Sequence, residues 1–161
     1  MGGVFVSTMV VLLVAAAFVN DIRSMRIPNA LTASFFGAGV LYHLIAEGLA
    51  GAGYALVGGL AGLLPLLVLY ALRGIGAGDV KFFAALGAVI GAVNVLYVLM
   101  NSILYGGLLG ALMLAFNKAS GRKLMSGIVS VLVTSKTEGT RFPFMIAVVP
   151  GVITAWYFIP A

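Results

Sequence analysis

The stretch FFAALGAVIGAVNVLYVLMNSILYGGLLGALMLAF, residues 82–116, runs for 35 residues without a charged side chain. A helix needs about 20 apolar residues to cross a bilayer. The stretch therefore holds either one long tilted helix or two helices joined by a turn, and the best place for a turn is Gly91-Ala92-Val93-Asn94. The choice decides how often the chain crosses the membrane and on which side its charged residues lie.

The composition places the whole chain in a lipid environment. Its 161 residues are 63% hydrophobic and 8% charged. A soluble domain of this size has too little interior to hide so much apolar surface. We expect one compact membrane domain over residues 1–161, without a soluble appendage. Because no basic residue precedes the first apolar run, we expect that run to be a retained helix and not a signal peptide.

Four further apolar runs cover about 3–19, 30–45, 52–72 and 143–158. If 82–116 folds back once, all nine lysines and arginines fall on one side of the membrane. The positive-inside rule favours that arrangement. The sequence thus predicts an all-α membrane protein, a bundle of six transmembrane helices. In this prediction the fourth helix, about 81–92, is short, both termini lie outside, and 118–142 forms a cytoplasmic loop.

Two of the four acidic residues lie at predicted membrane boundaries. Asp21 ends the first apolar run and Asp79 precedes the fourth, so both are expected at the cytoplasmic face. Two close carboxyl groups resist double ionisation, and they can supply the carboxylate and the carboxylic acid that an aspartic protease needs. A simpler reading is that Asp79 N-caps the fourth helix and that Asn20-Asp21 forms a loop or cap.

The residues next to the aspartates suit a site that binds an extended peptide. Gly76 and Gly78 would let backbone and substrate come close and allow unusual backbone angles. Pro28 would start the second helix firmly, with Asn29 in its first turn. Lys81 would tune the charge of Asp79 or bind a phosphate headgroup, and the alternative is an ordinary snorkelling lysine.

Other kinds of site are disfavoured. The chain has no cysteine and one histidine, His43, so no cysteine- or histidine-based metal site is expected. Its net charge of +5 is spread over loops, which argues against a nucleic-acid partner. His43 and Glu47, spaced i, i+4, are expected to form a local pair or, alternatively, a proton relay.

Glycine spacing predicts close helix packing. Three pairs have small-xxx-small spacing: Gly58/Gly62, Gly87/Gly91 and Gly106/Gly110. Such pairs let helices approach closely inside lipid, where tight packing supplies much of the association energy.

Two motifs resemble those of the prepilin peptidase family of membrane aspartic proteases. They are Asp-x-x-x-x-x-Ile-Pro-Asn-x-x-Thr at 21–32 and Gly-x-Gly-Asp-Val-Lys at 76–81. The segment 142–147 loosely resembles a third family segment, and we expect no catalytic role for it. The resemblance covers residues 1 to about 160 as one small peptidase domain.

The resemblance implies an activity. Family members cut the short basic leader from type IV pilin-like precursors on the cytoplasmic side, usually after a glycine. It implies that Asp21 and Asp79 are the catalytic pair and that Gly76 and Gly78 shape the site. Larger members carry a cysteine-containing domain that methylates the new N-terminus. That domain is not expected here, so no metal, methyl donor or other cofactor is implied, as in compact members that serve Flp/Tad pili.

Three rival functions stay open at this point. Archaeal preflagellin peptidases share the two aspartates. A small proton-coupled transporter would use Asp21, Asp79 and Glu47 as relay groups. That function predicts carboxylate side chains distributed through the thickness of the membrane, and none is expected between the aspartates and Glu47. A non-catalytic scaffold would tolerate Asp→Asn at both sites. The expected partners of the peptidase are a prepilin or pseudopilin precursor and membrane lipids.

Overall fold

The computed structural model describes residues 3–24, 27–72, 75–116 and 145–158. Within these ranges every regular element is a helix and no strand occurs. The predicted loop over 118–142 lies outside the described residues. The described helices are α1 (Val4–Ser24), α2 (Asn29–Ala71), α3 (Ala77–Ile90), α4 (Ala92–Phe116) and α6 (Met145–Phe158).

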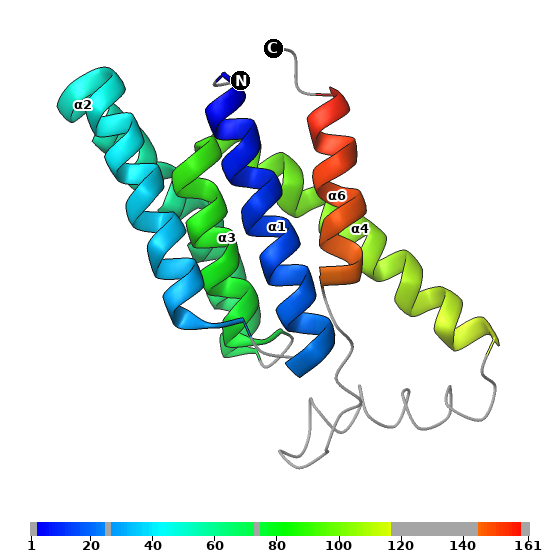
Figure 1. Ribbon diagram of the computed structural model, residues 1–161. Coiled ribbons are helices and arrows are strands. Elements are labelled where there is room, and N and C mark those ends of the chain that lie inside the picture. Colours follow the sequence, from blue (N-terminus) through cyan, green and yellow to red (C-terminus); the bar gives the residue numbers. More distant parts are fainter. Residues whose placement is uncertain (1–2, 25–26, 73–74, 117–144, 159–161) are drawn as a thin grey trace.

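The element α2 consists of two antiparallel arms. Gly48 interrupts it with φ 66° and ψ −147°, a conformation that glycine adopts without the penalty other residues incur. The chain reverses there, and the two arms, 29–47 and 49–71, lie side by side (Figure 1). Five helices are therefore described where six segments were predicted, because the predicted spans 30–45 and 52–72 form one element with a break.

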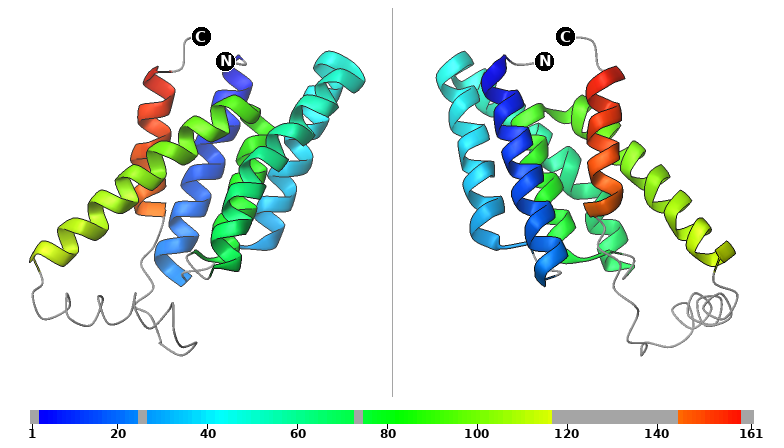
Figure 2. Two further views of the ribbon diagram at one scale, coloured as in Figure 1. Left: turned by 180° about the vertical axis from the view of Figure 1, so that it is seen from behind. Right: turned by 45° about the vertical axis from the view of Figure 1, so that its right-hand side comes forward.

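The long uncharged stretch folds back, as the distribution of basic residues predicts. α3 ends at Ile90, and Gly91, with φ 83°, separates it from α4. With 14 residues, α3 is about 21 Å long and shorter than the hydrocarbon core of a bilayer. α4 then runs back and slants away from the other helices (Figure 2).

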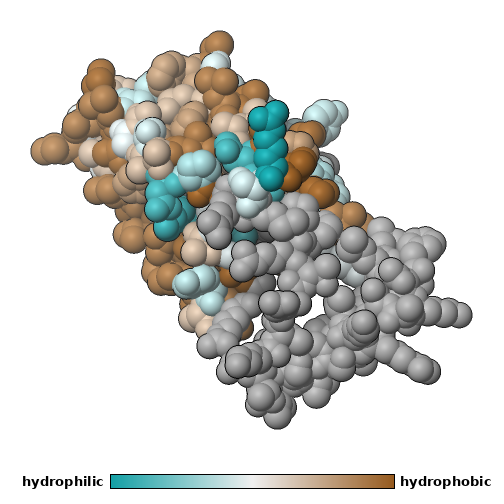
Figure 3. All heavy atoms as spheres, turned by 60° about the horizontal axis from the view of Figure 1, so that its bottom comes forward, coloured by the Kyte–Doolittle hydropathy of each residue, from teal (hydrophilic) through white to brown (hydrophobic). Residues whose placement is uncertain are grey.

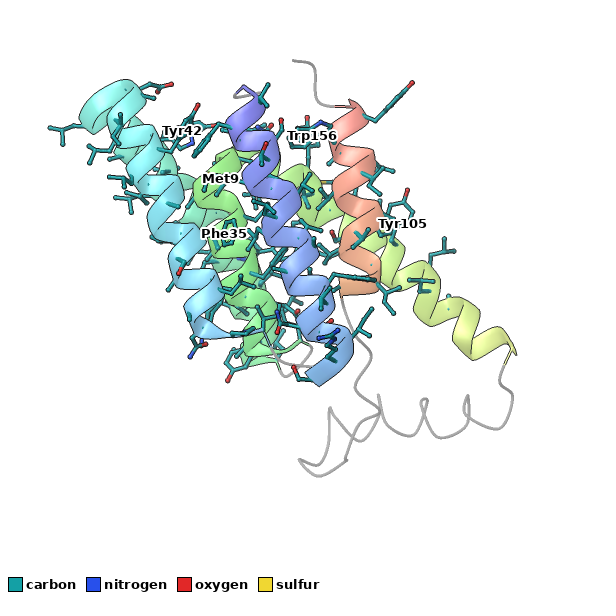
Figure 4. The ribbon with its side chains drawn as sticks, viewed as in Figure 1. Met9, Phe35, Tyr42, Tyr105 and Trp156 are labelled. Atoms are coloured by element: carbon teal, nitrogen blue, oxygen red, sulfur yellow. The ribbon has the colours of Figure 1, made fainter. Side chains whose placement is uncertain are left out.

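α3 forms the centre of the bundle. Every residue from Phe82 to Ile90 is buried, and Met9 of α1 and Phe35 of α2 lie over this helix (Figure 4). Glycines allow the close approach to α2. A Cβ at Gly58 would collide with the backbone carbonyl of Gly87, and one at Gly62 with that of Phe83. Two of the three predicted glycine pairs thus pack helices together, whereas Gly110 faces open space among the described residues.

Polar side chains bind the carbonyl end of α3. Nε2 of His43 lies 3.1 Å from the carbonyl oxygen of Val89. The Tyr54 hydroxyl and the Asn94 amide both donate to the carbonyl of Ile90. Terminal carbonyls of a helix lack partners within it and need such donors inside a membrane. The hydrogen bond described for His43 is thus with α3, and in the described part of the chain none joins it to Glu47 as predicted.

The outer surface is apolar. In the described part of the chain, three elements are long and apolar enough to cross a membrane: Val4–Ser24, Asn29–Ala71 and Ala92–Ala111. Large hydrophobic side chains such as Leu12, Leu60 and Leu104 are exposed on them. The protein is accordingly an integral membrane protein. With the lower end of the molecule turned forward, a small set of hydrophilic residues lies beside the mostly apolar sides (Figure 3).

Several helix ends meet at one end of the bundle, which we call the aspartate end. α1 ends there, both arms of α2 have their outer termini there, and α3 and α6 begin there (Figure 1). Glu47, beside the reversal at Gly48, lies at the opposite end. This topology brings together segments that are far apart in the sequence.

Candidate active site

Asp21 lies within α1, one turn before its end, and not in a loop or cap. Its side chain is only 7% exposed. Its Oδ2 accepts a hydrogen bond of 3.2 Å from the backbone N–H of Met145, the first residue of α6. A buried carboxylate needs such a partner, and a helix N-terminus supplies free amides and positive potential.

Asp79 lies in the first turn of α3, where Gly76 is the N-cap residue. Asp79 is therefore the third residue of the helix and not its N-cap, as the simpler reading of the sequence had it. Its carboxylate reaches back to a hydrogen bond with the Gly76 backbone. A carboxylate at this position commonly binds the N-cap amide in this way.

The two aspartates lie close enough to interact electrically. The pKa of the partly buried Asp79 is raised to about 6: burial is the main cause, the charge of Asp21 acts in the same direction, and the hydrogen bond with Gly76 acts against both. Burial and a like charge both disfavour ionisation of a carboxyl group. The site therefore combines one carboxyl group that holds a proton unusually well with a second that accepts a backbone hydrogen bond.

Lys81 links α3 to the start of α2. Its Nζ donates a hydrogen bond of 2.9 Å to Oδ1 of Asn29, and its side chain is otherwise exposed. Among the described residues no ion pair joins Lys81 to either aspartate. The two predicted motifs thus meet through Lys81 and Asn29, in addition to the electrostatic interaction between their aspartates.

Pro28 and the glycines position the chain around the aspartates. Pro28, with φ −60°, is the N-cap residue of α2, and its carbonyl oxygen accepts a hydrogen bond from the Thr32 amide. Pro28 therefore stands at the start of the second helix, as predicted. A Cβ at Gly78 would lie 3.5 Å from the Ile27 side chain, an ordinary contact. Gly76 has φ −79°, so the unusual backbone angles predicted for this motif do not occur at its N-cap.

Sequence reasoning missed the contribution of α6. The segment 142–147 was expected to have no catalytic role, yet the amide of Met145 binds a candidate catalytic carboxylate. Phe142, Pro143 and Phe144 lie outside the described residues. The contact joins residues 124 positions apart through a backbone group, so only the family resemblance of the segment pointed to it.

The described residues contain no group of three His, Cys, Asp or Glu side chains that could hold a metal ion. The chemistry that this arrangement supports is proton transfer between two carboxyl groups and a water molecule.

Comparison with known proteins assigns the chain to a family. A sequence profile of the type IV leader peptidase family matches residues 8–111, a range that contains both Asp21 and Asp79. The chain belongs to the type IV leader peptidase family. Its α1–α3 core and most of α4 are thus the part that carries the family pattern.

Individual relatives agree with this assignment to the leader peptidase family. A prepilin leader peptidase/N-methyltransferase of Aeromonas hydrophila is 37% identical over 105 residues, which cover 61% of this chain and 36% of the relative. A protein of the same name from Aeromonas salmonicida (strain A449) is also 37% identical over 105 residues, with 35% of its length covered. The chain spans about a third of the length of these curated relatives. No solved structure matches it.

Proposed function

We propose that this protein is a membrane aspartic endopeptidase that cuts the basic leader from type IV prepilin-like precursors. The observation that carries the proposal is the pairing of Asp21 on α1 with Asp79 on α3. Family membership supports the peptidase activity, and the names of the relatives support a prepilin substrate. The proposal concerns the peptidase step alone.

In the proposed mechanism Asp21 is the base and Asp79 is the acid. The Asp21 carboxylate takes a proton from water, whose oxygen attacks the scissile carbonyl carbon, while Asp79 donates its proton to the carbonyl oxygen. Asp21 then passes its proton to the leaving nitrogen as the C–N bond breaks, and one hydroxyl of the intermediate returns a proton to Asp79. The elevated pKa of Asp79 suits the acid role.

The proposed site of cleavage is the cytoplasmic face of the inner membrane. Five of the nine basic residues fall within 118–141, between the end of α4 and the start of α6. α6 begins at the aspartate end, and positive loops favour the cytoplasm. The precursor's apolar helix would lie among the helices, with its basic leader at the surface and the scissile bond across the aspartates. Gly76, Gly78, Pro28, Asn29 and Lys81 would shape this site.

Within the family we propose a Flp-type precursor as substrate, with an archaeal-type preflagellin as the second choice. A proton-coupled transporter is disfavoured because Glu47 lies at the opposite end of the bundle from the aspartates. Among the described residues no carboxylate lies between the two ends.

The proposed function can be tested by incubating the purified protein with precursors in detergent and identifying the products by mass spectrometry. We expect one cut after the leader glycine of a Flp-type precursor, less with a preflagellin, and less when the leader lysines and arginines are changed to glutamine. Asp79→Asn should abolish the cut at equal protein abundance. Intact precursors of every type with the wild-type protein would refute the proposed function.

A further inference from the structure

We propose that the N-terminus of α6 positions the catalytic base: the backbone N–H of Met145 holds Asp21 in the orientation in which it takes a proton from water. Met145 is thus a positioning residue that acts through its main chain. The inference rests on the proposed function and extends it to a helix outside the two aspartate motifs.

The first argument is the restriction of the Asp21 carboxylate. The side chain is 7% exposed, and within the described residues the Met145 amide is its hydrogen-bond partner, on Oδ2. An aspartate carboxylate can rotate about its terminal torsion over a broad range. One fixed donor on Oδ2 selects an orientation and leaves Oδ1 for a water molecule.

The second argument is that the amide of Met145 is free to act. The first four amides of a helix have no partner within it, and Met145 is the first residue of α6. The helix dipole adds positive potential at this point, which attracts a negatively charged oxygen atom. The Met145 amide is therefore available to hold Oδ2 of Asp21 in a fixed position.

The third argument is that α6 is firmly held. The side chains of Met145, Ala147 and Val148 are all fully buried. A Cβ at Gly151 would lie 2.5 Å from Oγ of Ser102, a residue of α4, so the two helices pack in close contact. Trp156 packs against the same core (Figure 4). A donor on a rigid, packed element can fix a catalytic group within the small tolerance that catalysis requires.

The test removes the N–H while keeping the helix. Proline is well accepted at the first position of a helix, where its missing N–H leaves the helical hydrogen bonds intact. Met145→Pro deletes the donor and the side chain, and Met145→Ala deletes only the side chain. We expect kcat for precursor cleavage to be about 10- to 100-fold lower in Met145→Pro than in Met145→Ala, the range for a hydrogen bond to a charged group. KM should agree within about 2-fold, as expected when only transition-state stabilisation is lost.

A second pair of variants decides the question even if the proline variant fails to fold. An amide-to-ester replacement at residue 145 keeps the buried side chain and removes only the N–H. The same replacement at Ile146 is the matched control, because its amide is also in the first turn and has no described contact with Asp21. The ester at 145 should lower kcat and the ester at 146 should not, at equal thermal stability.

The outcomes separate this inference from the proposed function. Equal kcat for Met145→Pro and Met145→Ala, or for the two esters, would overturn the role of α6 while wild-type cleavage and its loss in Asp21→Asn leave the peptidase intact. Absence of cleavage by the wild-type protein would instead refute the peptidase and the inference together.

Discussion

At the scale of the residue, the site depends on two carboxyl groups in different surroundings. Asp21 accepts a hydrogen bond from a backbone amide, and Asp79 is partly buried and interacts with the charge of Asp21. Environments that separate the proton affinities of two acids commonly assign the roles of acid and base. The first three predictions follow from the pKa of Asp79.

The activity should fall as the pH rises through about 6, the raised pKa of Asp79. An acid with a raised pKa keeps its proton between pH 4 and 6 and loses it above, so kcat/KM should decline up to about tenfold per pH unit there. The pair as a whole titrates, so the measured value belongs to both groups.

The cause of the raised Asp79 pKa can be tested by NMR titration of the carboxyl 13C signals of labelled protein in detergent. In Asp21→Asn the pKa of Asp79 should fall toward 3.8 without reaching it, because the like charge is gone while the burial remains. An Asp79 pKa that is the same in wild type and Asp21→Asn would show that the two groups do not interact.

Replacement of Asp79 by asparagine should increase the stability of the protein, although it abolishes the activity. Because the pKa of Asp79 is raised by folding, its favourable contribution is present below about pH 4 and is lost as the pH rises through about 6. Asp79→Asn should therefore raise the thermal midpoint by about 2–4 °C at pH 8 and by less at pH 5. Thermal unfolding at both values checks this, and a destabilised variant at pH 8 would contradict it.

Sequence reasoning at this scale worked for scarce, charged residues and failed for backbone groups. Asp21 and Asp79 stand out because acids are rare in the chain. The amide of Met145 has no signature in the sequence. His43 was paired with its helical neighbour Glu47, whereas the free carbonyl of Val89 at the end of α3 is its observed partner.

At the scale of the element, glycine packing fixes α3 against both arms of α2. Gly58 and Gly87 face each other so closely that a Cβ on either would meet the backbone of the other. Backbone cannot move aside as a flexible side chain can. The position of α3 sets the position of Asp79 in its first turn.

Gly58→Ala should accordingly destabilise the protein by roughly 1–3 kcal/mol, the usual cost of overpacking. Gly37→Ala is the control, because Gly37 lies on the same element with open space around it, and alanine there should be neutral or slightly stabilising. Thermal unfolding in one detergent compares the two. Equal midpoints for both variants would contradict the packing of α3 described here.

The basic residues predicted the elements better than hydropathy alone. They indicated that 82–116 folds back, and the break occurs at Gly91, the first residue of the expected turn. The union of the second and third predicted spans into α2 was not foreseen, because a single glycine reverses the chain without a polar loop. Gly110 has open space around it among the described residues, so its spacing from Gly106 alone did not reveal whether it packs against a described helix.

At the scale of the whole molecule, the bundle has two chemically different ends. The aspartates, Lys81 and Asn29 lie at one end, and Glu47 lies at the other. The helical class and the membrane location could be predicted from composition. The side of the membrane on which each end lies is a prediction from the nine basic residues, seven of which fall outside the described ranges.

The orientation can be measured directly because the natural chain has no cysteine. In intact cells a membrane-impermeant maleimide should label Glu47→Cys, whereas Lys81→Cys should react only after permeabilisation. Both positions are exposed, so a fully denatured sample serves as the control for reactivity. The reverse pattern would place the aspartates outside and contradict the proposed site of cleavage.

The central claim is that Asp21 and Asp79 work as one catalytic pair. The most direct test is the cleavage rate of wild type, Asp21→Asn, Asp79→Asn and the double variant at matched abundance. Residues that act as a unit are strongly non-additive, so each single variant should lose about 10³-fold or more in kcat and the double variant should be no slower. Wild-type turnover in either single variant, or losses that multiply in the double variant, would contradict the pair.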